Sequence, residues 1–353
     1  MKIEEIDKNF ASASFEGLDI EWFNIRKAPF KIYGLLDDGE QFFRMPIEIA
    51  EKVSEGVTGL NKCTSGGRVR FATDSSFVAI AVEQPDFWIG PHITALSSGG
   101  FDLYCDDGRN KGFFGSFQPD CNIKKTRNVV RFAGRDWDEG VHNFTINFPL
   151  YAGVNDVYVG IKKGSTLSEG KAYEDKLPIV YYGSSITQGG CASRPGTCYQ
   201  NLICTQNNTD YIHLGFSGNA KGEDVMAEYI ASLPMSVFVY DYDHNAPDAD
   251  HLKKTHERFL RIIKDKHPNV PVIMLSKPTL NINDYQDSQR RQVIIDTYNK
   301  LKAEGDNNVY FIDGYEMLKG EFENECLVDY CHPTDLGFSR MASAIFKILN
   351  LII

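Results

Sequence analysis

The chain has 353 residues, which favours two domains over one, since single hydrophobic cores rarely grow beyond about 250–300 residues. Its net charge is −11 and no basic block compensates for it, so a nucleic-acid partner and an anionic membrane surface are both disfavoured. The longest apolar runs are much shorter than the roughly 18 residues of a membrane-spanning helix. They are predicted to be buried strands instead.

The N-terminal residues 1–10 are charged and lack the apolar core of a secretory signal. We therefore expect a cytoplasmic protein, or a secreted or periplasmic one if a leader has been removed. The 8 cysteines form no CxxC pair and no metal-finger spacing, so free thiols are expected. Cys191 and Cys198 flank a loop and could form a disulfide in an oxidising compartment.

From about residue 10 to residue 165, short and often alternating apolar segments are separated by Gly, Asp, Asn and Pro. Long helical periodicity is scarce in this part of the chain. The pattern predicts an antiparallel β-sandwich or jelly roll. A polar stretch from 164 to 176 predicts the domain boundary, so we assign residues 1–165 to an N-terminal β-domain and residues 166–353 to a second domain.

After Pro178 the pattern changes to a regular alternation of strand, loop and helix. This alternation predicts an α/β domain with a parallel sheet and helices on both faces. In such sheets the active site lies outside the carboxyl ends of the strands, where Ser185, Gly218 and Asn245 would all emerge. The expected strands are 178–183, 210–215, 236–242, 270–276 and 309–313, and the expected helices are 197–206, 222–232, 251–266, 290–304 and 336–350.

A serine and a downstream carboxylate–imidazole pair supply the groups of a nucleophilic hydrolase. Ser185 follows the first expected strand, within VYYGSSITQGG, and Asp329 and His332 lie close together in DYCHP. A serine hydroxyl is a weak nucleophile and needs a base within hydrogen-bond reach. His332 would take its proton, while Asp329 would hold the other ring nitrogen and stabilise the imidazolium. The sequence therefore predicts a serine esterase with Ser185, His332 and Asp329 as catalytic residues.

Acyl transfer also needs N–H donors that point at the developing oxyanion. Gly218 lies in LGFSGN, where the missing side chain allows its backbone N–H to approach closely. The side-chain amide of Asn245, in DHNAP, supplies a second donor. The backbone N–H of Ser185 would be the third.

In these blocks and in their order, the chain resembles the SGNH hydrolases, also called GDSL-type esterases. GSSIT stands where that family has GDS, with Ser184 in place of the aspartate, and Asp243 stands where the third block usually has a glycine. The resemblance implies a three-layer α/β/α hydrolase domain and an acyl-serine intermediate, without metal or cofactor.

More narrowly, GFDLY at residues 100–104 resembles the signature of a bacterial subgroup with an N-terminal β-domain. The chain is similar to two-domain carbohydrate esterases, in which a jelly roll packs beside the hydrolase domain. This resemblance implies removal of O-acetyl groups from a sugar or glycan. Sites of this family open onto loops, which suits short acyl groups on a bulky polar alcohol, whether a small molecule or an oligosaccharide.

Two other functions stay open. A thioesterase or lysophospholipase would share every catalytic residue and differ only in its pocket. A non-catalytic carbohydrate-binding protein would instead use the jelly roll as its functional module. The sequence also leaves the oligomeric state open.

The segment 85–104 is the best candidate for a loop that reaches over the active site, and His92 is its expected substrate contact. The Asp- and His-rich stretch 243–251 has the residue types of a metal site. However, its acidic residues suit the first turn of the following helix better. Neither a metal nor a cofactor is expected, and the glycine-rich motifs of nucleotide-binding sites are absent from the sequence.

Overall fold

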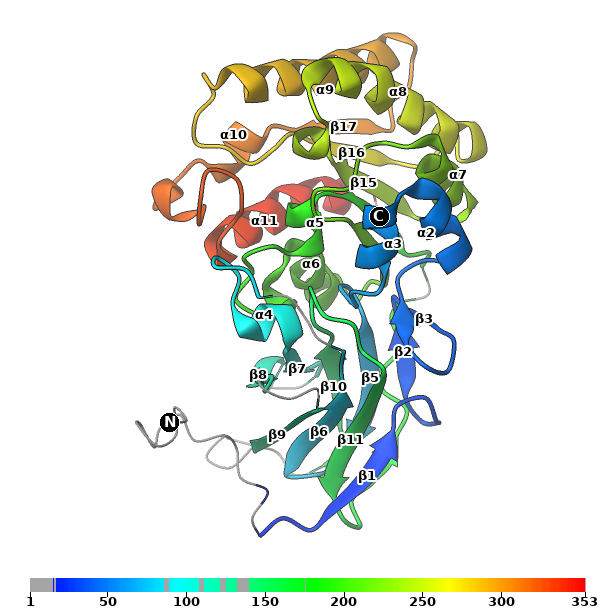
Figure 1. Cartoon of the computed structure of the whole chain (residues 1–353), viewed down its shortest axis with the longest axis vertical. Coiled ribbons are helices and arrows are strands. Elements are labelled where there is room, and N and C mark those ends of the chain that lie inside the picture. The colour runs from blue at the N-terminus through cyan, green and yellow to red at the C-terminus, as the bar shows by residue number, and fades with distance from the viewer. Residues whose placement is uncertain are drawn as a thin grey trace.

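The computed structural model describes residues 15, 17–85, 89–107, 111–120, 125–131, 140–174 and 176–352. Figure 1 shows two parts stacked along the long axis, an antiparallel β-sandwich and an α/β domain. Both were predicted from the sequence, and both are confirmed. The boundary near residue 165 stays a prediction. The short strand β12 (Leu167–Ser168) still pairs with the sandwich.

The sandwich consists of two antiparallel sheets with the strand orders β1-β11-β6-β9 and β12-β5-β10-β7-β8, and β2 pairs with β5. When the eight principal strands of the described chain, β1 and β5 to β11, are counted in sequence, the sheets read 1-8-3-6 and 2-7-4-5. This is the jelly-roll order. The bounds are β1 Ile20–Asn24, β2 Lys31–Tyr33, β5 Arg68–Thr73, β6 Phe77–Glu83, β7 Phe101–Cys105, β8 Gly112–Phe117, β9 Lys125–Arg131, β10 His142–Asn147 and β11 Asp156–Lys162.

Alternation along the strands explains the core between the two sheets. Successive strand residues point to opposite faces, so apolar residues two positions apart share one face. Val157, Val159 and Ile161 of β11 belong to the same buried cluster as Phe144 and Ile146 of β10. The first of these strands lies in one sheet and the second in the other, so their side chains join the sheets.

Within the described residues, two helices lie before β5, in the part of the chain for which little helix was predicted. They are α2 (Ile47–Val53) and α3 (Glu55–Asn61), which follow the short strands β3 (Leu36–Asp37) and β4 (Phe42–Phe43). Ala50 and Val57 of these helices belong to a core cluster of the α/β domain. Each helix has only 7 residues, or two turns, so its periodicity is too short to show in the sequence.

The α/β domain has a parallel sheet with the order β14-β13-β15-β16-β17 in the described chain. All the strands and helices predicted after Pro178 are present. The strands are β13 Ile179–Gly183, β14 Tyr211–Gly215, β15 Val237–Asp241, β16 Val272–Leu275 and β17 Val309–Ile312. The helices are α5 Ser185–Gln188, α6 Tyr199–Asn207, α7 Asp224–Ser232, α8 Ala249–Lys266, α9 Tyr285–Ala303, α10 Gly314–Leu318 and α11 Asp335–Ile352. No helix among the described residues is long and apolar enough to span a bilayer.

Helices cover both faces of this sheet, as Figure 1 shows. Residues of β13 alternate between two core clusters: Val180 and Tyr182 belong to one, and Ile179 and Tyr181 to the other. A strand that is buried on both faces reads as an unbroken apolar run, which is the pattern seen in its sequence.

The register of the sheet determines where the functional loops begin. β13 lies between β14 and β15, and Gly183 at its end is level with Gly215 and Asp241 at the ends of its neighbours. Three loops therefore begin at the same level, beyond the carboxyl ends of three neighbouring strands. This is the edge at which parallel α/β sheets bind their ligands.

Candidate active site

Ser185 begins the short helix α5, directly beyond the end of β13. Ser184 caps this helix, because its hydroxyl accepts the N–H of Ile186 at 3.1 Å. A Cβ added to Gly183 would lie only 1.9 Å from Asp241 Oδ1, so a side chain at this position would displace the neighbouring strand end. The turn thus holds the serine at the carboxyl edge of the sheet, where the sequence predicted it.

The three predicted catalytic side chains form one chain of contacts. His332 Nε2 lies 2.9 Å from Ser185 Oγ, and His332 Nδ1 lies 2.9 Å from Asp329 Oδ2. The other carboxylate oxygen, Asp329 Oδ1, accepts the backbone N–H groups of Cys331 and His332 at 2.7 Å each. Nucleophile, base and orienting carboxylate therefore stand in the order that a serine hydrolase needs.

The charge of Asp329 follows from its surroundings. Burial disfavours the carboxylate, but hydrogen bonds from the backbone N–H and the ring of His332, and from the N–H of Cys331, outweigh burial and lower its pKa. The group is therefore ionised at neutral pH and accepts the Nδ1 proton of His332. With that proton on Nδ1, the lone pair of Nε2 points at Ser185 Oγ and can accept its proton.

The two other predicted oxyanion donors lie in the loops beyond the strands that flank β13. Gly218 has a φ of +70°, and a Cβ built there would meet nothing within 4 Å, so its backbone borders open space. Asn245 Oδ1 accepts the N–H of Ala220 at 3.4 Å, which orients the amide by its oxygen and leaves its NH₂ group to donate elsewhere. Their action on an oxyanion, together with the N–H of Ser185, stays a prediction.

The loop after α5, residues 189–198, is held by the β-sandwich. Asp102 of β7 is fully buried and accepts Arg194 Nη1 at 3.0 Å and the backbone N–H of Gly196 at 2.7 Å. The hydroxyl of Tyr104 contacts Arg194 and donates to the carbonyl of Gly196 at 3.2 Å. Asp102 and Tyr104 are the aspartate and tyrosine of GFDLY. The physical role of that motif is therefore to fix this loop beside the serine.

The same loop is tied to the turn that carries the histidine. Ser193 donates its backbone N–H to Asp335 Oδ1 at 2.8 Å, and its carbonyl accepts Thr94 Oγ1 at 2.9 Å. Asp335 begins α11, shortly after His332. A Cβ on Gly190 would lie 3.2 Å from His332 Cδ2, so a glycine here lets the loop and the imidazole meet closely.

Comparison with known proteins assigns this arrangement to a family. Residues 176–350 match the GDSL-like lipase/acylhydrolase family, and residues 20–167 match the GxDLY family, described as the N-terminus of SGNH-hydrolase-type esterases. The chain is an SGNH hydrolase. It belongs to the subgroup with a GxDLY β-domain, and its enzyme class is that of the esterases and acylhydrolases.

Solved structures agree with this assignment. A GDSL-like lipase candidate from Bacteroides ovatus ATCC 8483 is 27% identical with a TM-score of 0.83, over 94% of this chain and 98% of that one. The salicylyl-acyltransferase of a tetracycline biosynthetic pathway is 20% identical with a TM-score of 0.74, over 94% and 97%. An acetyl xylan esterase from the rumen bacterium Butyrivibrio proteoclasticus is 13% identical with a TM-score of 0.59, over 94% and 98%. The last two share the fold. No curated protein matches the chain.

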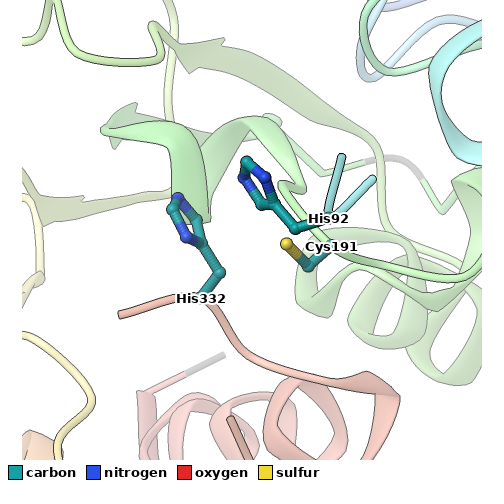
Figure 2. A group of neighbouring side chains, drawn as sticks. All are labelled: His92, Cys191 and His332. Carbon is teal, nitrogen blue, oxygen red and sulfur yellow. The ribbon is translucent and has the colours of Figure 1, made fainter. Parts of the chain in front are cut away.

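His92 lies at the active site of the hydrolase, in the loop before α4 (Ala95–Gly99). Its ring centroid is 5.3 Å from that of His332, and Figure 2 shows the two imidazoles beside the thiol of Cys191. The structure thus brings His92 to the site, while its contact with substrate stays a prediction. Cys191 and Cys198, considered above as a disulfide pair, are both free thiols.

The Asp- and His-rich stretch 243–251 serves the fold. Asp248 caps α8 by accepting the N–H of His251 at 2.7 Å, as predicted for the acidic residues here. The ring of His251 contacts the carbonyl of Lys221 at 2.8 Å, and the ring of His244 contacts Asp243 Oδ1 at 3.0 Å. Within the described residues, the groups of side chains that could hold a metal ion lie elsewhere.

Two features of the site were not predicted. Asp241, the last residue of β15, is buried and accepts a hydrogen bond from the hydroxyl of Thr187 in α5. Burial raises the pKa of Asp241 to about 7. The available sequence signal is a carboxylate at the end of the apolar strand VFVYD. The second feature is a cleft of about 650 Å³ beside Asp329, formed by loops far apart in the sequence, and it has no sequence signal.

The contact chain predicts how catalysis responds to substitution. Ser185→Ala should lower the rate of p-nitrophenyl acetate hydrolysis by more than about 10³-fold and leave the melting temperature nearly unchanged. His332→Ala should cost more activity than Asp329→Asn, because the second change leaves the base in place. A Ser185→Ala enzyme that keeps more than a few per cent of wild-type activity would contradict the assignment.

The ion pair between Arg194 and Asp102 predicts a change in the free energy of unfolding that depends on pH. Arg194→Met leaves the buried Asp102 charge without its ionic partner, which should cost about 3 kcal/mol of unfolding free energy at neutral pH and lower kcat. Burial already raises the pKa of Asp102, and Arg194 opposes that shift. Without Arg194 the folded pKa rises further above the unfolded value, so the folded state binds the proton more tightly and the cost shrinks as the pH falls.

Urea unfolding at acidic and neutral pH measures this difference. The matched control is Arg258→Met, which breaks the exposed pair of Arg258 with Asp224 and should change stability little at either pH. Equal losses for the two variants, or a loss for Arg194→Met that does not shrink in acid, would argue against the role given to Asp102.

Proposed function

We propose that this SGNH hydrolase is a carbohydrate acetylesterase, which removes acetyl groups from hydroxyls of a sugar or glycan through an acyl-serine intermediate. The observation that supports its chemistry is the contact chain from Ser185 Oγ through His332 to Asp329, with 2.9 Å at both steps. It contains the nucleophile, the base and the group that orients the base.

The reaction follows from this geometry in two halves. Ser185 Oγ attacks the ester carbonyl while His332 Nε2 takes its proton, and the oxyanion accepts N–H groups of Ser185, Gly218 and Asn245. His332 then gives the proton to the departing sugar oxygen, and the acyl-serine remains. Water repeats the attack with His332 as base, which releases acetate and restores the serine. Asp329 stabilises the imidazolium in both halves.

The cleft beside Asp329 is an argument for a substrate with a polar and bulky alcohol group. Its lining is mixed: Thr279, Asn281, Asp284 and Asn324 can hydrogen-bond hydroxyls, whereas Leu280, Leu327 and Val328 are apolar. Tyr330, which also lines it, is 95% exposed and offers a ring face on which a sugar can stack.

Structural neighbours support the same substrate class. A family two carbohydrate esterase from Clostridium thermocellum, solved with cellohexaose, is 13% identical with a TM-score of 0.58. That protein, like the acetyl xylan esterase described above, shares the two-part fold. We carry the acetylated carbohydrate over to this chain as a proposal.

Acyl-chain selectivity and acetate release test the proposal together. We expect kcat/KM to fall from p-nitrophenyl acetate to the octanoate, and acetate to be released from acetylated oligosaccharides by wild type and not by Ser185→Ala. A chelator should not lower the rate. Rates that rise with chain length would favour the thioesterase or lysophospholipase. An enzyme that neither hydrolyses esters nor reacts with a fluorophosphonate serine probe would favour the carbohydrate-binding protein.

A further inference from the structure

Three side chains with metal-ligating atoms meet beside the nucleophile. The ligand atoms of His92, Cys191 and His332 all lie within 4.8 Å of one another. Figure 2 shows the two rings and the sulfur converging from separate segments: the loop before α4, the loop after α5 and the turn before α11. Two imidazoles and one thiolate are ligands that Zn²⁺ prefers, and three protein ligands leave its fourth position open.

His332 is already prepared to act as a ligand through Nε2. Its Nδ1 lies 2.9 Å from Asp329 Oδ2. Zinc-binding histidines commonly donate their second ring N–H to a carboxylate, which fixes the tautomer and makes the ligating nitrogen more basic. The dyad that makes His332 a general base therefore also makes it a metal ligand.

Cys191 occupies an unusual backbone conformation. Its φ of +71° lies in the left-handed region, which a glycine adopts at lower cost than a cysteine. The side chain is 8% exposed and lies against the site. A bound dication stabilises the thiolate form of a cysteine that coordinates it.

A second group of possible ligands provides a contrast. Cys105, Asp107 and His142 also lie close together, but Cys105 Sγ and His142 Nδ1 both contact Asp107 Oδ1 at 3.4 Å. These groups bond to one another, far along the chain from the catalytic residues. In the first group, Nε2 of His332 faces the serine hydroxyl instead.

We propose that His92, Cys191 and His332 form a Zn²⁺ site whose occupation inhibits the enzyme. The ion takes the Nε2 lone pair that would otherwise accept the Ser185 proton, and the Cys191 thiol releases its proton to solvent as the Zn–S bond forms. The ligand atoms must approach one another by about 1 Å to reach tetrahedral Zn–N and Zn–S distances. Inhibition rests on the proposed esterase function, whereas metal binding does not.

Cobalt binding tests the site without any substrate. Co²⁺ replaces Zn²⁺ in tetrahedral sites, and a cobalt–thiolate bond gives a charge-transfer absorption in the near ultraviolet. Titration of the full chain should produce this band in wild type and in Cys331→Ser, and not in Cys191→Ser. Cys331→Ser is the matched control, because it removes a thiol next to His332 that is outside the group. A band that persists in Cys191→Ser would overturn the proposed ligand set.

Inhibition of p-nitrophenyl acetate hydrolysis tests the functional part. We expect micromolar Zn²⁺ to inhibit wild type reversibly, with full recovery on addition of a chelator. The inhibition constant should rise by about tenfold or more in Cys191→Ser and in His92→Gln, each compared with its own metal-free rate, and stay unchanged in Cys331→Ser. Equal inhibition constants in all four proteins would overturn the proposal, even where the cobalt band is present.

Discussion

The geometry of the active site depends on the hydrogen bonds that the buried carboxylate of Asp102 accepts from the 189–198 loop. This carboxylate has no exposed surface, and it accepts Arg194 Nη1, the N–H of Gly196 and the side-chain amide of Asn147 at 2.7–3.0 Å. A buried charge is tolerated only when it is paired and its lone pairs are satisfied, as they are here. Because two of these donors belong to the loop after the nucleophile helix, the β-sandwich is a structural part of the active site.

That contact matters because the predicted catalytic groups come from distant parts of the chain. Ser185 leaves the sheet at the end of β13, whereas His332 arrives on the turn before α11. The 189–198 loop joins them, since Ser193 bonds to Asp335 and Gly190 lies against the imidazole. A displacement of this loop would change the 2.9 Å between Ser185 Oγ and His332 Nε2, and proton transfer depends steeply on such a distance.

Much of the fold and of the site could be predicted from the sequence, for identifiable physical reasons. The apolar run before Ser185 is buried on both faces of the sheet, and strands of that kind are visible in a single sequence. Ser185, Asp329 and His332 were predicted because the chemistry requires those residue types in a strand-end and a turn context. The structure brings the three side chains into contact, and their catalytic role stays a prediction. The helices α2 and α3 were missed because two turns give too few residues for periodicity. The roles of Asp102 and Asp241 were missed because their partners, Arg194 and Thr187, are adjacent only after folding.

The same reasoning identifies a physical conflict inside the site. A general base needs an accessible lone pair whose basicity is raised by a carboxylate, and this describes a good metal ligand equally well. By holding Nδ1, Asp329 turns the Nε2 lone pair of His332 toward Ser185, and the same lone pair is the one that would coordinate Zn²⁺. What decides between the two roles is the number of further ligands within reach. His92 and Cys191 supply two, the first from the β-sandwich and the second from the loop that Asp102 holds. The contact that assembles the catalytic site thus also assembles the group that can block it.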